Sequence, residues 1–425
     1  MTNANTNTNA PALTSPDFLA RIDPARFVDV DLVDENFRQN ALPDLLADWA
    51  TRPPFYALRN RLPVMVCTRL RDVKEIYNHP DRFTVEIPPW PGYRVFDIFG
   101  GLENVLQMDG ERHGRIRRLM TPAFTPQAVM RLEADIDRII AGQIDQVASR
   151  GASFDAMDDF ARPIVMAVLL DAALKLKPDQ QAVFARMHDS IALATQFVPG
   201  EPFPDEFLAA VGEVIRITEE IVAERRERPG SDMISLLVTA RDQGDALTEG
   251  ELLGQINAIC SAGIGTTAAT IGGALLMLGK HPGQMDLLRA QPDLIDSAVE
   301  ECLRRHGPGI LTFVRFATED TEIDGVPVFK DMPVMASIQA ADLDPTEFPD
   351  PMTFDIRRNP RGIVAFGSGP HHCIGNRLGR LVMKKAILGL LQRFPGLRLA
   401  DPAFKPVYGG FPGELSLVSL PMRVN

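Results

Sequence analysis

The chain has 425 residues, of which 45% are hydrophobic and 24% charged, and its net charge is −12. These proportions are those of a globular protein, and the acidic balance argues against nucleic-acid binding, which needs a basic surface to displace counterions. Residues 1–15 (MTNANTNTNAPALTS) have almost nothing to bury, so we expect a disordered tail there. We find no signal peptide and no apolar stretch long enough to span a bilayer. We therefore expect a soluble, cytoplasmic, monomeric protein with one domain over 16–425.

Strand signals along the chain are few and short. The run Leu62–Cys67 (LPVMVC) predicts a buried strand, and Ile323–Val328 predicts a second one that bends at Asp324-Gly325. Between residues 125 and 305 apolar side chains recur at helical spacing almost throughout. From their periodicity and caps we expect helices over about 126–144, 205–228, 248–280 and 374–394. The sequence therefore predicts a predominantly α fold with a small β region.

One loop near the C-terminus carries the strongest chemical signal. It runs Phe366-Gly-Ser-Gly-Pro-His-His-Cys373-Ile-Gly375 and leads into an amphipathic helix. Its two glycines and proline predict a tight loop, and the following helix N-terminus favours a thiolate at Cys373. Such a thiolate can serve as a nucleophile, a zinc ligand or an iron ligand, although no set of further zinc ligands or catalytic base accompanies it. Small buried hydrophobes are expected at Cys67, Cys260 and Cys302.

This loop resembles the haem-binding loop of the cytochrome P-450 family, Phe-Gly-x-Gly-x-His/Arg-x-Cys-x-Gly, at every fixed position. The resemblance implies a helix-rich triangular prism that encloses haem b, with Cys373 as the axial thiolate ligand of the iron. It also implies that Phe366 packs beside the sulfur and that His371 contacts a haem propionate. Gly375 then allows close contact between the helix and the porphyrin. His372 falls at a variable position, where we expect a solvent-facing residue.

A second resemblance lies about 70 residues before Cys373. Glu301 and Arg304 are spaced i,i+3 on a predicted helix, which by itself indicates only a weak surface ion pair. Their position matches the family's Glu-x-x-Arg, and Arg358 stands where a third member is expected. The resemblance therefore implies a buried structural ion pair, which loss of one partner would leave as an uncompensated charge. The family's usual Asn-Arg-Asp has here become Asp342-Leu343-Asp344.

Three basic residues resemble the family's propionate contacts. His113 and Arg117 lie one turn apart on a predicted helix, so both side chains can face the same carboxylate. Arg315, in the segment Phe-Val-Arg, matches a strand arginine that pairs with the other propionate. The resemblance thus implies that these residues bind the cofactor.

The long helix carries Ala262–Thr267 (AGIGTT), with two glycines that cost about 1 kcal/mol each relative to alanine. In the family this helix opens over the iron to admit O₂, and Thr266 takes part in proton delivery. Gly265 stands where the family has an acid, which leaves the proton route open. A water chain anchored on Thr266, or a contribution from Ser261, would be alternatives to the missing acid.

The resemblance also places residues around a substrate. The expected pocket is lined by Ala258, Ser261, Ala262, Thr266, Leu311, Phe313, Val314 and Phe411. These side chains are mostly apolar, and the loop 87–99 adds aromatic groups, so we expect a small terpenoid, aromatic or similar substrate. A grip on a carboxylate by Arg94 with Tyr93 is the alternative.

These features predict a haem-thiolate monooxygenase that hydroxylates its substrate with O₂. Electrons would come from a 2Fe-2S ferredoxin and an NAD(P)H-dependent ferredoxin reductase, and a basic patch beside the cysteine loop would steer that acidic donor. The patch would comprise Arg112, Arg115, Arg118, Arg377, Arg380, Lys384 and Lys385. The alternatives are a haem-thiolate isomerase, dehydratase or peroxygenase without an external donor, and a non-catalytic haem-binding partner protein.

Overall fold

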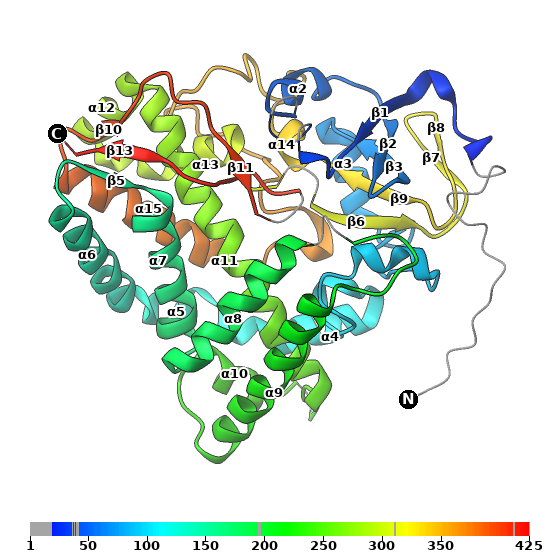
Figure 1. Ribbon diagram of the computed structural model, residues 1–425, viewed down its shortest axis with the longest axis horizontal. Coiled ribbons are helices and arrows are strands. Elements are labelled where there is room, and N and C mark those ends of the chain that lie inside the picture. The colour runs from blue at the N-terminus through cyan, green and yellow to red at the C-terminus, as the bar shows by residue number, and fades with distance from the viewer. Residues whose placement is uncertain are drawn as a thin grey trace.

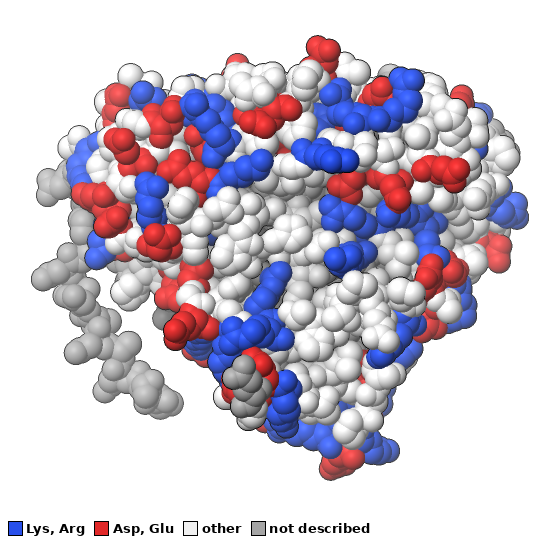
Figure 2. Space-filling view, turned by 180° about the vertical axis from the view of Figure 1, so that it is seen from behind, with Lys and Arg blue, Asp and Glu red and all other residues white. Residues whose placement is uncertain are grey.

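The computed structural model describes residues 19–35, 37, 39, 42–193, 197–242, 244–309, 312–410 and 413–424. The tail expected over 1–15 lies outside them. The molecule has a triangular outline, with helices filling the left and lower parts and the main sheet at the upper right (Figure 1). On the opposite face, acidic and basic side chains are interspersed around a largely uncharged band (Figure 2).

Helices dominate the structure, as the apolar periodicity predicts. They are α2 (Leu42–Trp49), α3 (Leu70–Asn78), α4 (Gly110–Met120), α5 (Pro126–Arg131), α6 (Glu133–Ser149), α7 (Arg162–Met166), α8 (Pro178–Ile191), α9 (Asp205–Glu227), α10 (Met233–Thr239), α11 (Glu249–Lys280), α12 (Pro282–Ala290), α13 (Ile295–Arg305), α14 (Ile338–Ala341) and α15 (Asn376–Arg393). Two π-helical segments, η6 (Met157–Ala161) and η7 (Ala167–Ala173), flank α7, and a 3₁₀ segment, η3, spans Pro91–Phe96.

The long central helix α11 begins where its cap predicts. The Thr248 hydroxyl accepts from the Glu251 N–H at 3.3 Å, and the Glu251 carboxylate accepts from the Thr248 N–H at 2.8 Å. The expectation that no segment could span a bilayer is wrong as stated, because α11 is long and apolar enough to do so. However, 67% of its most apolar window is buried inside the protein. Packing in the protein core therefore accounts for much of its apolar composition.

The strands are β1 (Phe27–Asp31), β2 (Phe55–Arg59), β3 (Leu62–Cys67), β4 (Phe83–Thr84), β5 (Ser153–Asp155), β6 (Thr312–Ala317), β7 (Thr321–Ile323), β8 (Val326–Val328), β9 (Pro333–Ala336), β10 (Arg398–Leu399), β11 (Tyr408–Gly409), β12 (Ser416–Leu417) and β13 (Pro421–Arg423). The main sheet has the order β1-β2-β3-β9-β6-β4, and β3 is buried throughout, as predicted. The predicted strand over 323–328 is instead a hairpin of β7 and β8. Asp324 and Gly325 turn it with φ of +49° and +71°, values that suit a tight two-residue turn.

Candidate functional site

Glycines shape the loop that precedes Cys373. Gly367 and Gly369 have φ of +74° and +66°, a region that side chains rarely adopt. A Cβ on Gly369 would lie 2.3 Å from the carbonyl oxygen of Tyr77, so no other residue fits there. The N–H of Cys373 donates to the carbonyl of Phe366 at 2.9 Å, which closes the loop just before α15. The loop is therefore held tightly against the end of α3, as its composition predicts.

The sulfur of Cys373 lies in a partly buried environment with mixed electrostatic effects. Burial raises the pKa of the Cys373 thiol, while the N–H groups of Gly375 and Asn376 and the charges of Arg117 and Arg380 act to lower it. The net shift is upward, so the helix N-terminus alone does not secure a thiolate. A metal ion bound to the sulfur would supply the missing stabilisation, because coordination requires the deprotonated form.

The neighbours of Cys373 are placed as follows. The ring of Phe366 lies under the guanidinium of Arg380, with 4.2 Å from Cζ to the ring centroid. Its expected contact with the sulfur stays a prediction. A Cβ on Gly375 would lie 3.9 Å from the Cys373 sulfur, so this glycine does stand close to it. His372 is exposed, as expected, and its carbonyl accepts a hydrogen bond from Arg117.

Two histidines from distant segments meet beside the loop. The rings of His113 on α4 and His371 are 4.2 Å apart between centroids, and His371 Nε2 lies 2.8 Å from Asp109 Oδ1. His113 is buried, and its Nε2 has no hydrogen-bond partner within the described residues. Burial, together with the nearby charges of His371 and Arg117, lowers the pKa of His113 to about 4, so this imidazole is neutral at pH 7. Its unsatisfied nitrogen is the kind of buried polar atom that calls for a ligand.

Two arginines complete this basic cluster. Arg117, one turn after His113 on α4, reaches the cysteine loop. Arg315 on β6 is only 4% exposed, and its guanidinium lies over the ring of Tyr77 at 5.0 Å. A group with two carboxylates, such as haem, suits an orphan imidazole nitrogen among three further basic side chains. The residues present therefore fit haem. In the described ranges no cluster of three or more His, Cys, Asp or Glu could hold a bare metal ion.

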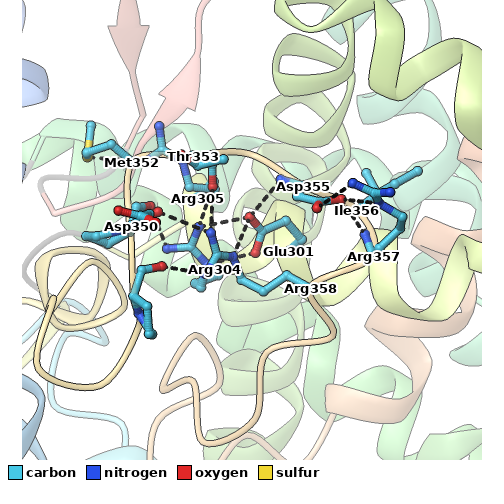
Figure 3. Close-up of polar contacts among 12 residues, drawn as sticks. Glu301, Arg304, Arg305, Asp350, Met352, Thr353, Asp355, Ile356, Arg357 and Arg358 are labelled. Atoms are coloured by element: carbon cyan, nitrogen blue, oxygen red, sulfur yellow. Dashed lines mark hydrogen bonds and ion pairs between the residues drawn. The ribbon is translucent and has the colours of Figure 1, made fainter.

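Glu301, Arg304 and Arg358 come together in the buried cluster that the family resemblance implies (Figure 3). Arg304 Nε and Nη2 donate to the two carboxylate oxygens of Glu301 at 2.7 and 2.9 Å, and both side chains are fully buried. Arg358 Nε donates to Glu301 at 3.3 Å. The remaining Arg304 donors reach the carbonyls of Asp342, Pro351 and Thr353. The cluster thus joins α13 to the loop that leads towards the cysteine.

The family assignment follows from comparison with known proteins. The cytochrome P450 family model matches residues 53–401. The chain belongs to the cytochrome P450 family. Cytochrome P450 CYP107DY1 of Priestia megaterium is 34% identical over 374 residues, which cover 87% of this chain and 89% of the relative. A steroid C26-monooxygenase of Mycobacterium tuberculosis is 32% identical over 386 residues, which cover 89% of this chain and 93% of the relative. The solved structure of myxobacterial cytochrome P450 CYP267B1 with myristic acid matches with a TM-score of 0.83 and 29% sequence identity. The match covers 92% of this chain and 99% of that structure's chain.

These matches confirm the predicted helical P450 fold with its small sheets, and they make the protein a P450 monooxygenase whose cofactor is haem. In this P450, however, α11 is helical without interruption from Glu249 to Lys280. The local opening expected at Gly263 and Gly265 stays a prediction. The Thr266 hydroxyl donates to the carbonyl of Ala262 at 2.7 Å, within the helix.

The glycines of α11 allow close packing. A Cβ on Gly263 would lie 2.9 Å from Leu169, in η7. A Cβ on Gly265 would lie 2.7 Å from Cε1 of His188, on α8, and 3.1 Å from Oε2 of Glu414, just before β12. Two polar side chains thus occupy the space where the family has its acid. Sequence reasoning missed both, because they approach Gly265 from segments about 77 and 149 residues away along the chain.

The expected substrate pocket is described only in part. Leu311 and Phe411 lie outside the described residues, and so does the side chain of Phe313. Ala258 and Val314 are buried. Ser261 and Ala262 are half-buried on α11, and Ser261 donates to the side-chain oxygen of Asn257 at 3.3 Å. That this set lines a substrate pocket stays a prediction.

The expected basic patch beside the loop is not basic in the folded P450. Six of its seven members form ion pairs with eight acidic side chains, and most of these pairs join different elements. Arg115, for example, contacts both Asp245 and Glu251, at 2.5 and 2.6 Å. Arg377 is the member without an ion pair in the described part of the chain. The prediction of local positive charge is therefore wrong, because acidic groups from other segments neutralise it.

Proposed function

We propose that this P450 hydroxylates a largely apolar organic molecule in the cytoplasm, acting as a monomer, with O₂ and electrons from a 2Fe-2S ferredoxin and its NAD(P)H-dependent reductase. The observation that carries the proposal is the tightly turned loop that presents Cys373 and also places His371 against the orphan imidazole of His113. One relative is named for a steroid, and one similar structure contains myristic acid; both molecules are largely apolar. A substrate of this kind agrees with the mostly apolar residues expected around the pocket.

Haem held by a thiolate supplies the activation of O₂. The role of the chain is to hold and orient that group. Cys373 would bind the iron, and His113, Arg117, Arg315 and His371 would bind the two propionates through charge-assisted hydrogen bonds. These four side chains come from α4, β6 and the loop, so the position in which the cofactor would be held depends on the tertiary fold.

On α11, Thr266 and Gly265 shape the proton supply. The Thr266 hydroxyl donates to the Ala262 carbonyl, which leaves its oxygen free to accept from a water molecule. Gly265 makes room for His188, whose Nδ1 is buried without a partner within the described residues, and for the carboxylate of Glu414. We propose that these two groups hold the water molecules that the family's acid would otherwise hold.

Reconstitution with a ferredoxin, its reductase and NAD(P)H tests the proposal. Product should form only with O₂ and NAD(P)H present, and Thr266→Ala should lower the product formed per NAD(P)H while raising peroxide. Turnover that needs no external electron donor would favour the isomerase, dehydratase or peroxygenase alternatives, which the missing acid at Gly265 keeps open. Failure to turn over any apolar substrate found by spectral screening would contradict the proposed substrate class.

The salt dependence of ferredoxin reduction tests the partner separately. Because the surface near the cysteine loop is neutralised by ion pairs, we expect the second-order rate constant to fall only weakly with ionic strength. A steep fall would show that the donor docks elsewhere, on a surface with excess positive charge.

A further inference from the structure

Arg59 is a buried cation with no counter-ion in the part of the chain that the structure describes. It is the last residue of β2 and is 5% exposed. Within the described residues its guanidinium makes no hydrogen bond and no ion pair, and its Nε is fully enclosed without a partner. Arg304, which is equally buried, makes five hydrogen bonds from the same three nitrogens. A buried charge is normally paired, so Arg59 departs from the rule that Arg304 follows.

The surroundings of Arg59 do not compensate its charge. Its Cζ lies 4.8 Å from the ring centroid of Phe96, and one such contact is worth much less than the desolvation of a guanidinium. The carboxylate of Asp31 already accepts the backbone N–H groups of Asn60 and Arg61, at 3.0 and 2.8 Å. Burial lowers the pKa of Arg59 to about 10, with Asp31 opposing, so the side chain remains charged at neutral pH.

One aromatic side chain contacts this charge directly, and an aromatic cluster from a second segment is joined to the adjacent residue Asn60. Phe96 ends η3, in the loop 87–99 that sequence analysis places beside the substrate. The next residue, Asn60, donates from Nδ2 to the carbonyl of Phe197 at 2.8 Å, in the connection between α8 and α9. The ring of Phe197 packs on Phe203 and Phe207 at 5.0 and 5.2 Å. In Figure 1 this green connection extends from the helical part towards the sheet. Arg59 thus lies where the β2–β3 hairpin meets two connecting segments.

We propose that Arg59 binds the carboxylate of an acidic substrate whose apolar remainder lies against these aromatic side chains. The proposal rests on the proposed function and names the substrate class for it. A carboxylate matches the planar guanidinium, since its two oxygens can accept two parallel N–H bonds. Of the earlier candidates for this role, Tyr93 already uses its hydroxyl on the carbonyl of Asp331, and the Arg94 side chain lies outside the described residues.

Calorimetric titration of the haem-loaded protein with tetradecanoic acid and 1-tetradecanol tests the proposal, because these probes differ only at the polar end. We expect the acid to bind at least about tenfold more tightly than the alcohol. Arg59→Met should lower the affinity for the acid by about 10- to 100-fold and leave the affinity for the alcohol unchanged. Arg61→Met is the matched control: Arg61 is the exposed neighbour, and it should change neither affinity.

Thermal unfolding separates binding from a structural role. The acid should raise the Tm of the wild type but not of Arg59→Met, and the ligand-free variant should be no less stable than the wild type, since it loses an unpaired buried charge. The proposal would be overturned if the wild type bound acid and alcohol with equal affinity or did not bind the acid. It would also be overturned if Arg59→Met lowered the affinity for both probes alike. The CO spectrum of the same samples keeps the two hypotheses apart. If the thiolate band is present and the acid does not bind, only the role of Arg59 fails.

Discussion

Two buried polar regions of this P450 differ in how completely they are satisfied. Glu301, Arg304 and Arg358 leave no buried side-chain nitrogen or oxygen without a partner, because α13 and the segment after α14 bring donors and carbonyls together. Around the cofactor and α11, by contrast, buried atoms lack partners in the described residues: His113 Nε2, His188 Nδ1 and Asn257 Nδ2. The first region is completed by the protein alone, and the second has the unsatisfied groups expected where ligands and water bind.

The largest effect should come from the cofactor ligand. The reduced protein with CO should show the red-shifted Soret band of thiolate ligation, and Cys373→Ser should abolish it, because serine cannot supply the thiolate. Cys260→Ser and Cys302→Ser are the controls. Both thiols are buried with pKa raised by burial, so neither is placed to bind iron, and both variants should keep the band. A band retained in Cys373→Ser would refute the assignment of the site.

The satisfied cluster should be the most sensitive to loss of a partner. Arg304→Met removes the two shortest bonds to the buried carboxylate of Glu301 and leaves it the Arg358 and Asp355 N–H contacts at 3.3 and 3.2 Å. We therefore expect a loss of about 3–5 kcal/mol in the free energy of unfolding. Urea unfolding measures this loss. Arg357→Met is the control. The Arg357 side chain is exposed where it pairs with Asp355, so this variant should change the free energy of unfolding by less than about 1 kcal/mol. Similar losses in both variants would contradict the contrast between the regions.

His306 lies between the two regions and should make stability depend on pH. It follows α13 directly, and its Nδ1 has no partner among the described residues. Burial, with a contribution from Arg305, lowers the pKa of His306 from 6.5 to about 4. The unfolded chain therefore takes up this proton first, so stability is complete above about pH 6.5 and falls as the pH drops towards 4.

At pH 5 this single histidine should lower the free energy of unfolding by about 2 kcal/mol relative to pH 7.5. His306→Gln should remove that part of the loss, which urea midpoints at the two pH values would show. His79→Gln, at an exposed position, should leave the wild-type difference intact. Equal acid destabilisation in wild type and His306→Gln would show that this imidazole is already charged in the fold.

The smallest effect concerns the crowded glycine of α11. Gly265→Ala places a Cβ 2.7 Å from His188, and we expect a loss of about 1–2 kcal/mol. Combining it with His188→Ala should recover most of that loss, as thermal unfolding of the single and double variants would show. Gly142→Ala on α6 meets open space and should instead stabilise by about 0.5–1 kcal/mol. Independent, additive effects at positions 265 and 188 would argue against their contact.

Where interactions are local, the sequence predicted both structure and chemistry. The span of α11, the strand β3 and the glycine-rich loop before Cys373 depend on periodicity, caps and backbone freedom within a few residues. The i,i+3 spacing of Glu301 and Arg304 likewise placed one pair on one helix face. These features are fixed by neighbours along the chain, and so they could be recognised before the fold was known.

Only the tertiary structure decided how charges and close contacts are shared between distant segments. The basic residues near Cys373 are neutralised by partners such as Asp245, 130 residues from Arg115. Gly265 packs against His188 and Glu414. Arg59 is buried against Phe96 with no counter-ion among the described residues. Burial and pairing depend on which surfaces meet after folding, and a sequence pattern shows the charge of a side chain but not the partner that will face it.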